Sequence, residues 1–176
     1  MIEKKLKPEK SPKWLRVSGW VILAINALCM INAAWFFLAL ARFPFIGWIF
    51  FNACFVSSLI WIVGFIFKWR WMMMASLPFL LFFGGGGLFI FPWSGNMITA
   101  QVSHIAMMFA LTYAIVDAFV TRGWKSKLIG LAGGIAVFAG FLIVQQDYAK
   151  KHPELWLKMG MQAPNAESGA TRRYNK

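Results

Sequence analysis

The feature that most constrains this chain is an almost unbroken apolar stretch from Trp14 to Val144. Short polar or basic interruptions divide it into pieces close to the roughly 20 residues that a helix needs to cross about 30 Å of hydrocarbon. Hydrophobic residues make up 60% of the sequence and charged residues only 14%, well below the charged content of a soluble domain. The sequence therefore predicts an all-α, polytopic integral membrane helix bundle.

Five transmembrane helices are predicted, between a basic N-terminal segment (1–13) and a basic tail (147–176) that follows the bundle (14–146). We expect the tail to lie on the membrane surface and to become disordered toward its end. A four-span alternative treats the fifth span as a shallow hairpin, because it is close to the minimum length and rich in glycine. The predicted spans are 14–41, 45–67, 71–91, 98–120 and 128–144.

Basic residues cluster at alternate connections of the five predicted spans. By the positive-inside rule this side is cytoplasmic, which places the N-terminus in the cytoplasm, in a bacterial-type inner membrane. The basic tail then falls on the opposite side, which weakly contradicts the rule. The net charge of +12 does not indicate nucleic-acid binding, because the basic residues lie at the ends of apolar runs, where topology and anionic headgroups account for them.

Four consecutive glycines, Gly84, Gly85, Gly86 and Gly87, follow Pro78 within the predicted third span. Each glycine costs about 1 kcal/mol relative to alanine inside a helix, and the proline removes a backbone hydrogen bond. We expect this span to be kinked or locally unwound. Freed carbonyl or N–H groups would then face a substrate or an ion, as in many carriers. The alternative, favoured because close glycine packing is common in membranes, is a smooth surface for a neighbouring helix or a flat cofactor.

The predicted fifth span carries a GxxxG pattern at Gly130 and Gly134, beside a second row of small residues at Ala132, Ala136 and Gly140. Small residues let helix backbones approach closely in a membrane. The doubled row predicts a helix contact on this span.

His104 is the only histidine inside a predicted span, and Gln101 precedes it by one turn. An imidazole in this position is able to ligate a haem iron or a chlorophyll magnesium, to bond a quinone or to relay protons. The alternative is a structural histidine bonded to a neighbouring helix, which the lack of a second intramembrane histidine favours. His104 is therefore a candidate cofactor-binding residue, although the sequence identifies no cofactor.

Further polar side chains lie within the apolar runs at Asn26, Asn32 and Asn52. Together with Gln101 and His104 they are candidates for a polar pathway, although hydrogen bonds between helices are the default role of such groups. Asp117 is the only acid inside a predicted span, at the basic side of the membrane. We expect it to form an ion pair with one of the nearby cations, with a proton-coupling site as the alternative.

The sequence lacks the motifs of hydrolytic or transferase chemistry, such as GxSxG, HExxH or a phosphate loop. The first functional expectation is an accessory or structural subunit of a larger membrane assembly, such as an energy-transducing one, whose partners are the lipid bilayer and other membrane subunits or a second copy. The second is a small oligomeric carrier or channel for a small solute or ion. The third is a cofactor-binding membrane protein that uses His104.

Overall fold

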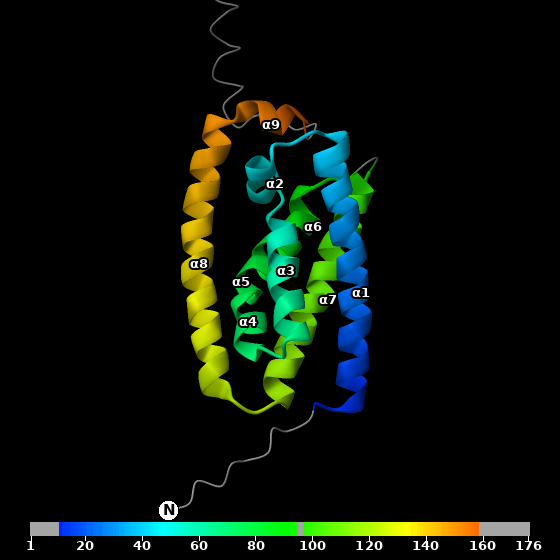
Figure 1. Ribbon diagram of the computed structural model, residues 1–176, viewed down its shortest axis with the longest axis vertical. Helices are drawn as coiled ribbons and strands as arrows, with labels where there is room; N and C mark the ends of the chain where they lie inside the picture. The colour runs from blue at the N-terminus through cyan, green and yellow to red at the C-terminus, as the bar shows by residue number, and fades with distance from the viewer. Residues whose placement is uncertain (1–10, 95–96, 159–176) are drawn as a thin grey trace, which may run out of the picture.

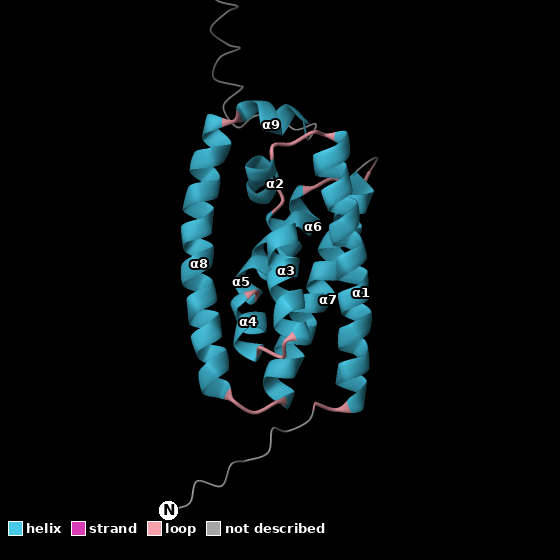
Figure 2. Cartoon of the chain, viewed as in Figure 1, coloured by secondary structure: helices cyan, strands magenta, loops and turns pink. Residues whose placement is uncertain are grey.

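The computed structural model describes residues 11–94 and 97–158 and is built from helices, with no strand among these residues. The basic N-terminal segment lies almost wholly outside the described part, as do residues 159–176. Figure 2 shows the helices joined by short loops at the ends of the bundle and by short breaks within it. The elements are α1 (Lys13–Ala34), η1 (Trp35–Leu40), α2 (Phe45–Phe51), α3 (Ala53–Ile66), α4 (Arg70–Ala75), α5 (Leu77–Phe79), η2 (Leu80–Gly85), α6 (Gly86–Ile90), α7 (Ile98–Val120), α8 (Trp124–Lys151) and α9 (Pro153–Lys158).

Among the residues that the structure describes, four helical segments are each long and apolar enough to cross a membrane: 13–40, 70–90, 98–120 and 124–151. A fifth crossing is counted if the bent pair α2 and α3 forms one span, because the two helices meet at an angle of 82°. The protein is therefore a multi-pass membrane bundle with four or five spans. Figure 1 shows the first residues of α1 and the loop between α7 and α8 at one end of the bundle, and α2 and α9 at the other.

The helices pack in an order that differs from their order in the chain. α1 lies against α7 on one flank, while α8 lies against α4 on the opposite flank, with α3, α5, η2 and α6 between them (Figure 1). The main core lies where α3, η2 and α7 meet, and it contains Trp61, Leu80, Met107 and Ala110. A smaller cluster of Phe43, Trp48 and Leu155 holds α2 under α9 at the end of the bundle away from the basic loops.

The fifth span is a continuous helix, as the five-span prediction expects, so the four-span alternative of a shallow hairpin over 128–144 is wrong. α8 runs for 28 residues, beginning before the predicted span and continuing beyond it into the predicted tail. A helix in lipid must satisfy its backbone groups internally, and its glycines therefore stay helical despite their low propensity. The bent span is instead the second one, which breaks at Asn52 between α2 and α3.

The tetraglycine segment is also helical and is not unwound. The chain from 70 to 90 forms one crossing, in which the π-helical turn η2 carries Gly84 and Gly85 and α6 begins at Gly86. Pro78 lies in the first turn of the short helix α5, where its missing N–H costs least. Wider π turns, rather than exposed backbone, accommodate the predicted irregularity.

Candidate functional site

The second span breaks at Asn52. Its backbone leaves the helical region (φ −120°, ψ 56°), and its side-chain oxygen accepts a hydrogen bond from the N–H of Phe55 at 3.3 Å, capping α3. Asparagine is a favoured helix cap because it bonds backbone donors that the first turn leaves free. On the other side of the break, the carbonyl of Phe50 accepts a 2.6 Å hydrogen bond from Gln145 of α8. Both exposed ends of the broken backbone thus obtain a side-chain partner.

The break leaves α3 too short to cross the bilayer alone. Its 14 residues extend about 21 Å, against about 30 Å of hydrocarbon. α2 lies across the end of the bundle instead of continuing the span (Figure 1). In the part of the hydrocarbon layer that α3 does not reach, a cavity of about 120 Å³ lies beside the break.

This cavity, called here the break cavity, is bounded by η1, the α2–α3 break, the end of α6 and the first turns of α7. Its walls are mostly aromatic and small apolar side chains. The polar residues in the lining are uncharged amides, hydroxyls, a thiol and an imidazole. The lining consists of Asn32, Ala33, Phe36, Phe37, Phe51, Asn52, Cys54, Phe91, Met97, Thr99, Ala100, Ser103 and His104.

His104 lies at the centre of a hydrogen-bonded chain that forms part of one wall of this cavity. Its Nδ1 is 3.3 Å from Oε1 of Gln101, and its Nε2 is 3.4 Å from Sγ of Cys54. Gln101 in turn donates from Nε2 to the carbonyl of Phe91 at 2.6 Å. Since the amide oxygen of Gln101 can only accept, Nδ1 carries the proton, and Nε2 accepts from the thiol. The chain links α3, α7 and the end of α6.

Packing fixes the imidazole as firmly as these bonds do. Its ring stacks on Phe91 with centroids 5.5 Å apart and planes 14° from parallel. On another side it lies over Gly87, where an added Cβ would be only 2.5 Å from Cε1 and Nε2. A Cβ added to Gly84 would lie 3.0 Å from Cβ of Met107, which is on α7 like His104. Two of the four glycines therefore form a close surface for α7, which is the packing interpretation of the tetraglycine.

Asn52 presents an unpaired donor beside the break cavity. The residue is 95% buried, and Nδ2 finds no acceptor among the residues that the structure describes. A buried amide N–H without a partner costs about 1–3 kcal/mol, so its position beside an open volume indicates a place for a water molecule or a ligand acceptor. Asn32 lines the same cavity from α1.

A second cavity of about 300 Å³ lies on the other side of the break, toward α8. Phe51, Cys54 and Phe91 line both cavities and thus separate them. Gln145, which bonds the broken backbone, is part of the second lining. The broken span therefore has open volume on two sides, divided by two aromatic rings and a thiol.

The candidate polar pathway is only partly assembled. Asn32, Asn52 and His104 line the break cavity, and Gln101 supports His104 from behind. Asn26 lies elsewhere, where it donates to the carbonyls of Ile22 and Ala106 at 3.0 Å and accepts from Ser58 at 3.3 Å. This second set of bonds joins α1, α3 and α7 within the membrane, the default role of such amides.

Asp117 lies at the opposite, basic end of the bundle. Its Oδ2 is 3.2 Å from Nε of Arg70, and Thr121 donates to both its backbone and its side-chain oxygen. Lys127 is also fully buried here and donates to the carbonyls of Ala118 and Thr121 at 2.7 and 2.5 Å. A lysine at this position completes the last turn of α7 and complements its dipole. These contacts make the cluster a structural anchor between α4, α7 and α8.

The GxxxG face of α8 packs against another helix of the same chain, α4. A Cβ on Gly130 or on Gly134 would overlap the backbone of α4 at Trp71 or Ala75. Gly133 and Gly140, by contrast, have nothing within 4 Å. The contact expected of α8 is thus with α4, while the second row of small residues faces outward.

A macrocyclic cofactor does not fit the surroundings of His104. The break cavity of about 120 Å³ is smaller than the roughly 300–1,000 Å³ of drug-sized ligand sites. Both ring nitrogens are engaged, and no group of three metal-ligating side chains occurs among the described residues.

Sequence reasoning missed Cys54 and Gln145 as members of the site, and it did not place the break at Asn52. A cap-forming asparagine inside an apolar run was the available signal. Compared with known protein families, characterised proteins and solved structures, the chain matches none.

Proposed function

We propose that this protein is a small membrane carrier for an uncharged solute, which binds in the break cavity. The observation that carries the proposal is the unpaired, buried amide of Asn52 beside an open volume at a broken span. Broken helices beside cavities are a recurrent architecture of solute sites in transporters, because irregular backbone is tolerated there.

The lining supports a particular class of solute. None of its side chains is an aspartate, glutamate, lysine or arginine, so an ion would lose its hydration without a counter-charge. The free Nδ2 of Asn52 requires a hydrogen-bond acceptor. About 120 Å³ is roughly the share of four water molecules in the liquid. A small polyol or amide matches this size and chemistry.

Passage through the membrane requires movement, because the half of the bundle below the cavity is filled. Trp61, Met107 and Ala110 are buried there, and Asn26 ties three helices together. The movable parts are α2 and the rings of Phe51 and Phe91, which separate the two cavities. We propose that their displacement joins the two cavities, and that the packed half must open in a further movement before the solute reaches the basic side.

The test is solute flux into proteoliposomes, measured by stopped-flow light scattering with glycerol and urea. Ala100→Phe fills the break cavity from α7, whereas Ala139→Phe adds the same ring to the outward face of α8. The proposal predicts flux above that of protein-free vesicles for the wild type and Ala139→Phe, and loss of that flux in Ala100→Phe. Equal rates in Ala100→Phe and Ala139→Phe contradict it.

A second variant tests the amide itself. Asn52→Ser keeps a side chain that caps helices well but removes the Nδ2 donor. We expect this variant to fold like the wild type and to lose about tenfold in solute affinity, the equivalent of one hydrogen bond of about 1.4 kcal/mol. Unchanged concentration dependence of the flux would remove Asn52 from the site.

An accessory role is the second candidate, and the outward row of small residues on α8 favours it. Ala132, Ala136 and Gly140 are exposed on that helix, whereas Gly130 and Gly134 are occupied by α4. If this row binds another subunit, native mass spectrometry of the protein extracted with its lipids gives a hetero-complex, and Ala136→Trp dissociates it. A homogeneous single chain in the wild type would count against this role.

We also propose that the basic end faces the cytoplasm of a bacterial-type cell. The cations near α1, α4 and the α7–α8 loop support this orientation through the positive-inside rule. An alkaline phosphatase fused to the C-terminus should then be active, since five crossings place that end outside. An inactive fusion contradicts the orientation or the fifth crossing.

A further inference from the structure

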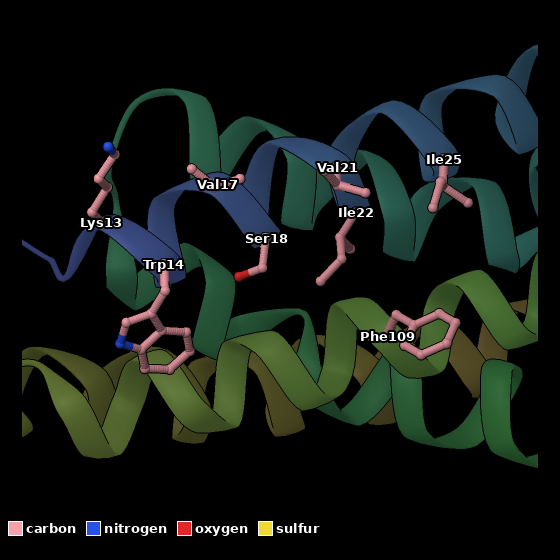
Figure 3. A pocket seen from close by; sticks show the side chains of 8 residues that line it. All are labelled: Lys13, Trp14, Val17, Ser18, Val21, Ile22, Ile25 and Phe109. Carbon is pink, nitrogen blue, oxygen red and sulfur yellow. The ribbon is translucent and has the colours of Figure 1, made fainter.

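An open groove runs between α1 and α7 on the outer surface of the bundle and shares no lining residue with the break cavity. It encloses about 930 Å³ and is walled by the aliphatic side chains of α1 and by Phe109 of α7. Figure 3 shows Lys13 and Trp14 at one end and Ile25 and Phe109 toward the other. The lining residues are Lys13, Trp14, Val17, Ser18, Val21, Ile22, Ile25 and Phe109.

The wall of this groove is apolar except at its basic end. Ser18 does not present a free donor, because its hydroxyl donates to the carbonyl of Leu15 at 3.0 Å. Val17, Val21 and Phe109 are each more than half exposed, so they form a surface that an apolar chain can cover. The groove therefore combines a hydrocarbon-like wall with one terminal ammonium group.

The length of the groove corresponds to one leaflet. From Lys13 to Ile25 α1 rises about 18 Å, against about 15 Å for half of the hydrocarbon layer. A transmembrane helix of a partner would cover both leaflets, about twice this length. An acyl chain that starts at the headgroup level fits the groove along its length.

The positive charge at the basic end of the groove favours a lipid with an anionic headgroup. Lys13 is exposed and has no carboxylate partner among the described residues, and Arg16 follows one turn later. Asp117 is the only acid at this end within the described part of the chain, and Arg70 already pairs with it. Lysine and arginine near the surface attract anionic lipids, and a tryptophan such as Trp14 prefers the same depth.

We propose that the α1–α7 groove is a binding site for an anionic glycerophospholipid, with one acyl chain along Val17, Val21 and Ile25 and the phosphate at Lys13. The site is independent of the carrier proposal, because it shares no lining residue with the break cavity. The proposal makes the outward face of α1 a lipid-binding surface.

The test is native mass spectrometry of the full-length protein in mild detergent, with phosphatidylglycerol or phosphatidylcholine added at equal concentration. Lys13→Gln removes the charge, and Val21→Trp fills the chain path. Lys125→Gln and Ile135→Trp make the same changes on α8, where both residues are exposed. We expect wild type and both α8 controls to prefer phosphatidylglycerol.

Loss of one headgroup contact should lower phosphatidylglycerol binding about fivefold in Lys13→Gln. Val21→Trp should lower the binding of both lipids at least as much. Equal binding of the two lipids to the wild type overturns the proposal. Lys13→Gln changes the surface and leaves the fold intact, so phosphatidylglycerol binding by this variant at the wild-type level also overturns the proposal. A protein dimer that Val21→Trp dissociates overturns it as well, because a second copy would then occupy the groove.

Discussion

Two neighbouring glycines of the tetraglycine segment should respond in opposite ways to the same substitution. A Cβ on Gly87 would lie 2.5 Å from two atoms of the His104 ring, whereas a Cβ on Gly86 meets nothing closer than Ile90, at 4.0 Å. The ring cannot move away freely, since it is 97% buried, stacked on Phe91 and bonded at both nitrogens. Gly87→Ala therefore strains the site, and Gly86→Ala is its matched control.

The magnitudes follow from packing and helix propensity. Carbon atoms attract best at about 3.5–4.0 Å, so a separation about 1 Å shorter forces an overpacked arrangement that costs about 1–3 kcal/mol. At either position, replacing glycine by alanine stabilises the helix by up to about 1 kcal/mol through its higher helix propensity. We expect Gly87→Ala to lower the free energy of unfolding by about 1 kcal/mol and Gly86→Ala to raise it by about 0.5–1 kcal/mol.

The assay is reversible SDS denaturation in mixed micelles, followed by far-ultraviolet circular dichroism. A double-mutant cycle with His104→Ala identifies the cause, because the truncated side chain leaves room for the new methyl group. In that background Gly87→Ala should become neutral or stabilising. A Gly87→Ala variant as stable as Gly86→Ala, or one whose cost persists without the imidazole, would refute the proposed packing of α6 on α7.

Three further tests, two of them with a second variant, address the remainder of the bundle. Gly134→Ala should lower thermal stability in detergent by about 2 kcal/mol, because the new methyl group overlaps the backbone of α4; Gly133→Ala, which meets nothing within 4 Å, should be neutral or stabilising. Asp117→Asn should cost about 2 kcal/mol by leaving Arg70 without its partner, and the double variant with Arg70→Gln should recover part of that loss in a cycle; fully additive costs would contradict the ion pair. Lys127→Met should lower stability by about 2 kcal/mol because two carbonyls of α7 lose their donor, and an unchanged melting temperature would remove Lys127 as the cap of that helix.

The spans were predictable wherever a long apolar run ends in turn or basic residues. The fourth predicted span has the same bounds as α7, Ile98–Val120, because polar turns flank it on both sides. The third differs from the structure by only a residue at each end, despite its glycines. In lipid, length and hydrophobicity decide whether a segment spans, and local helix propensity has less influence.

The bend at Asn52 was not predictable in the same way. Its apolar run is long enough for a normal span, and one asparagine inside such a run more often bonds across helices. What stabilises the break is distant in sequence, since Gln145 of α8 bonds the carbonyl of Phe50 and Leu155 packs in the cluster over α2. Only the folded chain brings these groups together.

Lys127 shows a similar limit at the basic end. Its position predicted only a cation at the basic face of the membrane, whereas in the structure the side chain is buried against the last turn of α7. Long side chains can bury their stems and direct the charged group to backbone carbonyls, which depends on the geometry of the following turn. That turn is formed by Gly123, whose φ of 99° is a left-handed conformation that other residues seldom adopt.

The central claim is that the second span is broken at Asn52 beside the break cavity, and amide hydrogen exchange tests it most directly. The first N–H groups of a helix have no intrahelical acceptor, so the amides of Ala53 and Cys54 at the start of α3 should exchange rapidly in lipid nanodiscs. Residues 106–111 in the middle of α7 should remain protected in the same sample. Protection of the Ala53 and Cys54 amides as strong as that of α7 would mean a continuous helix at this point and would contradict the account.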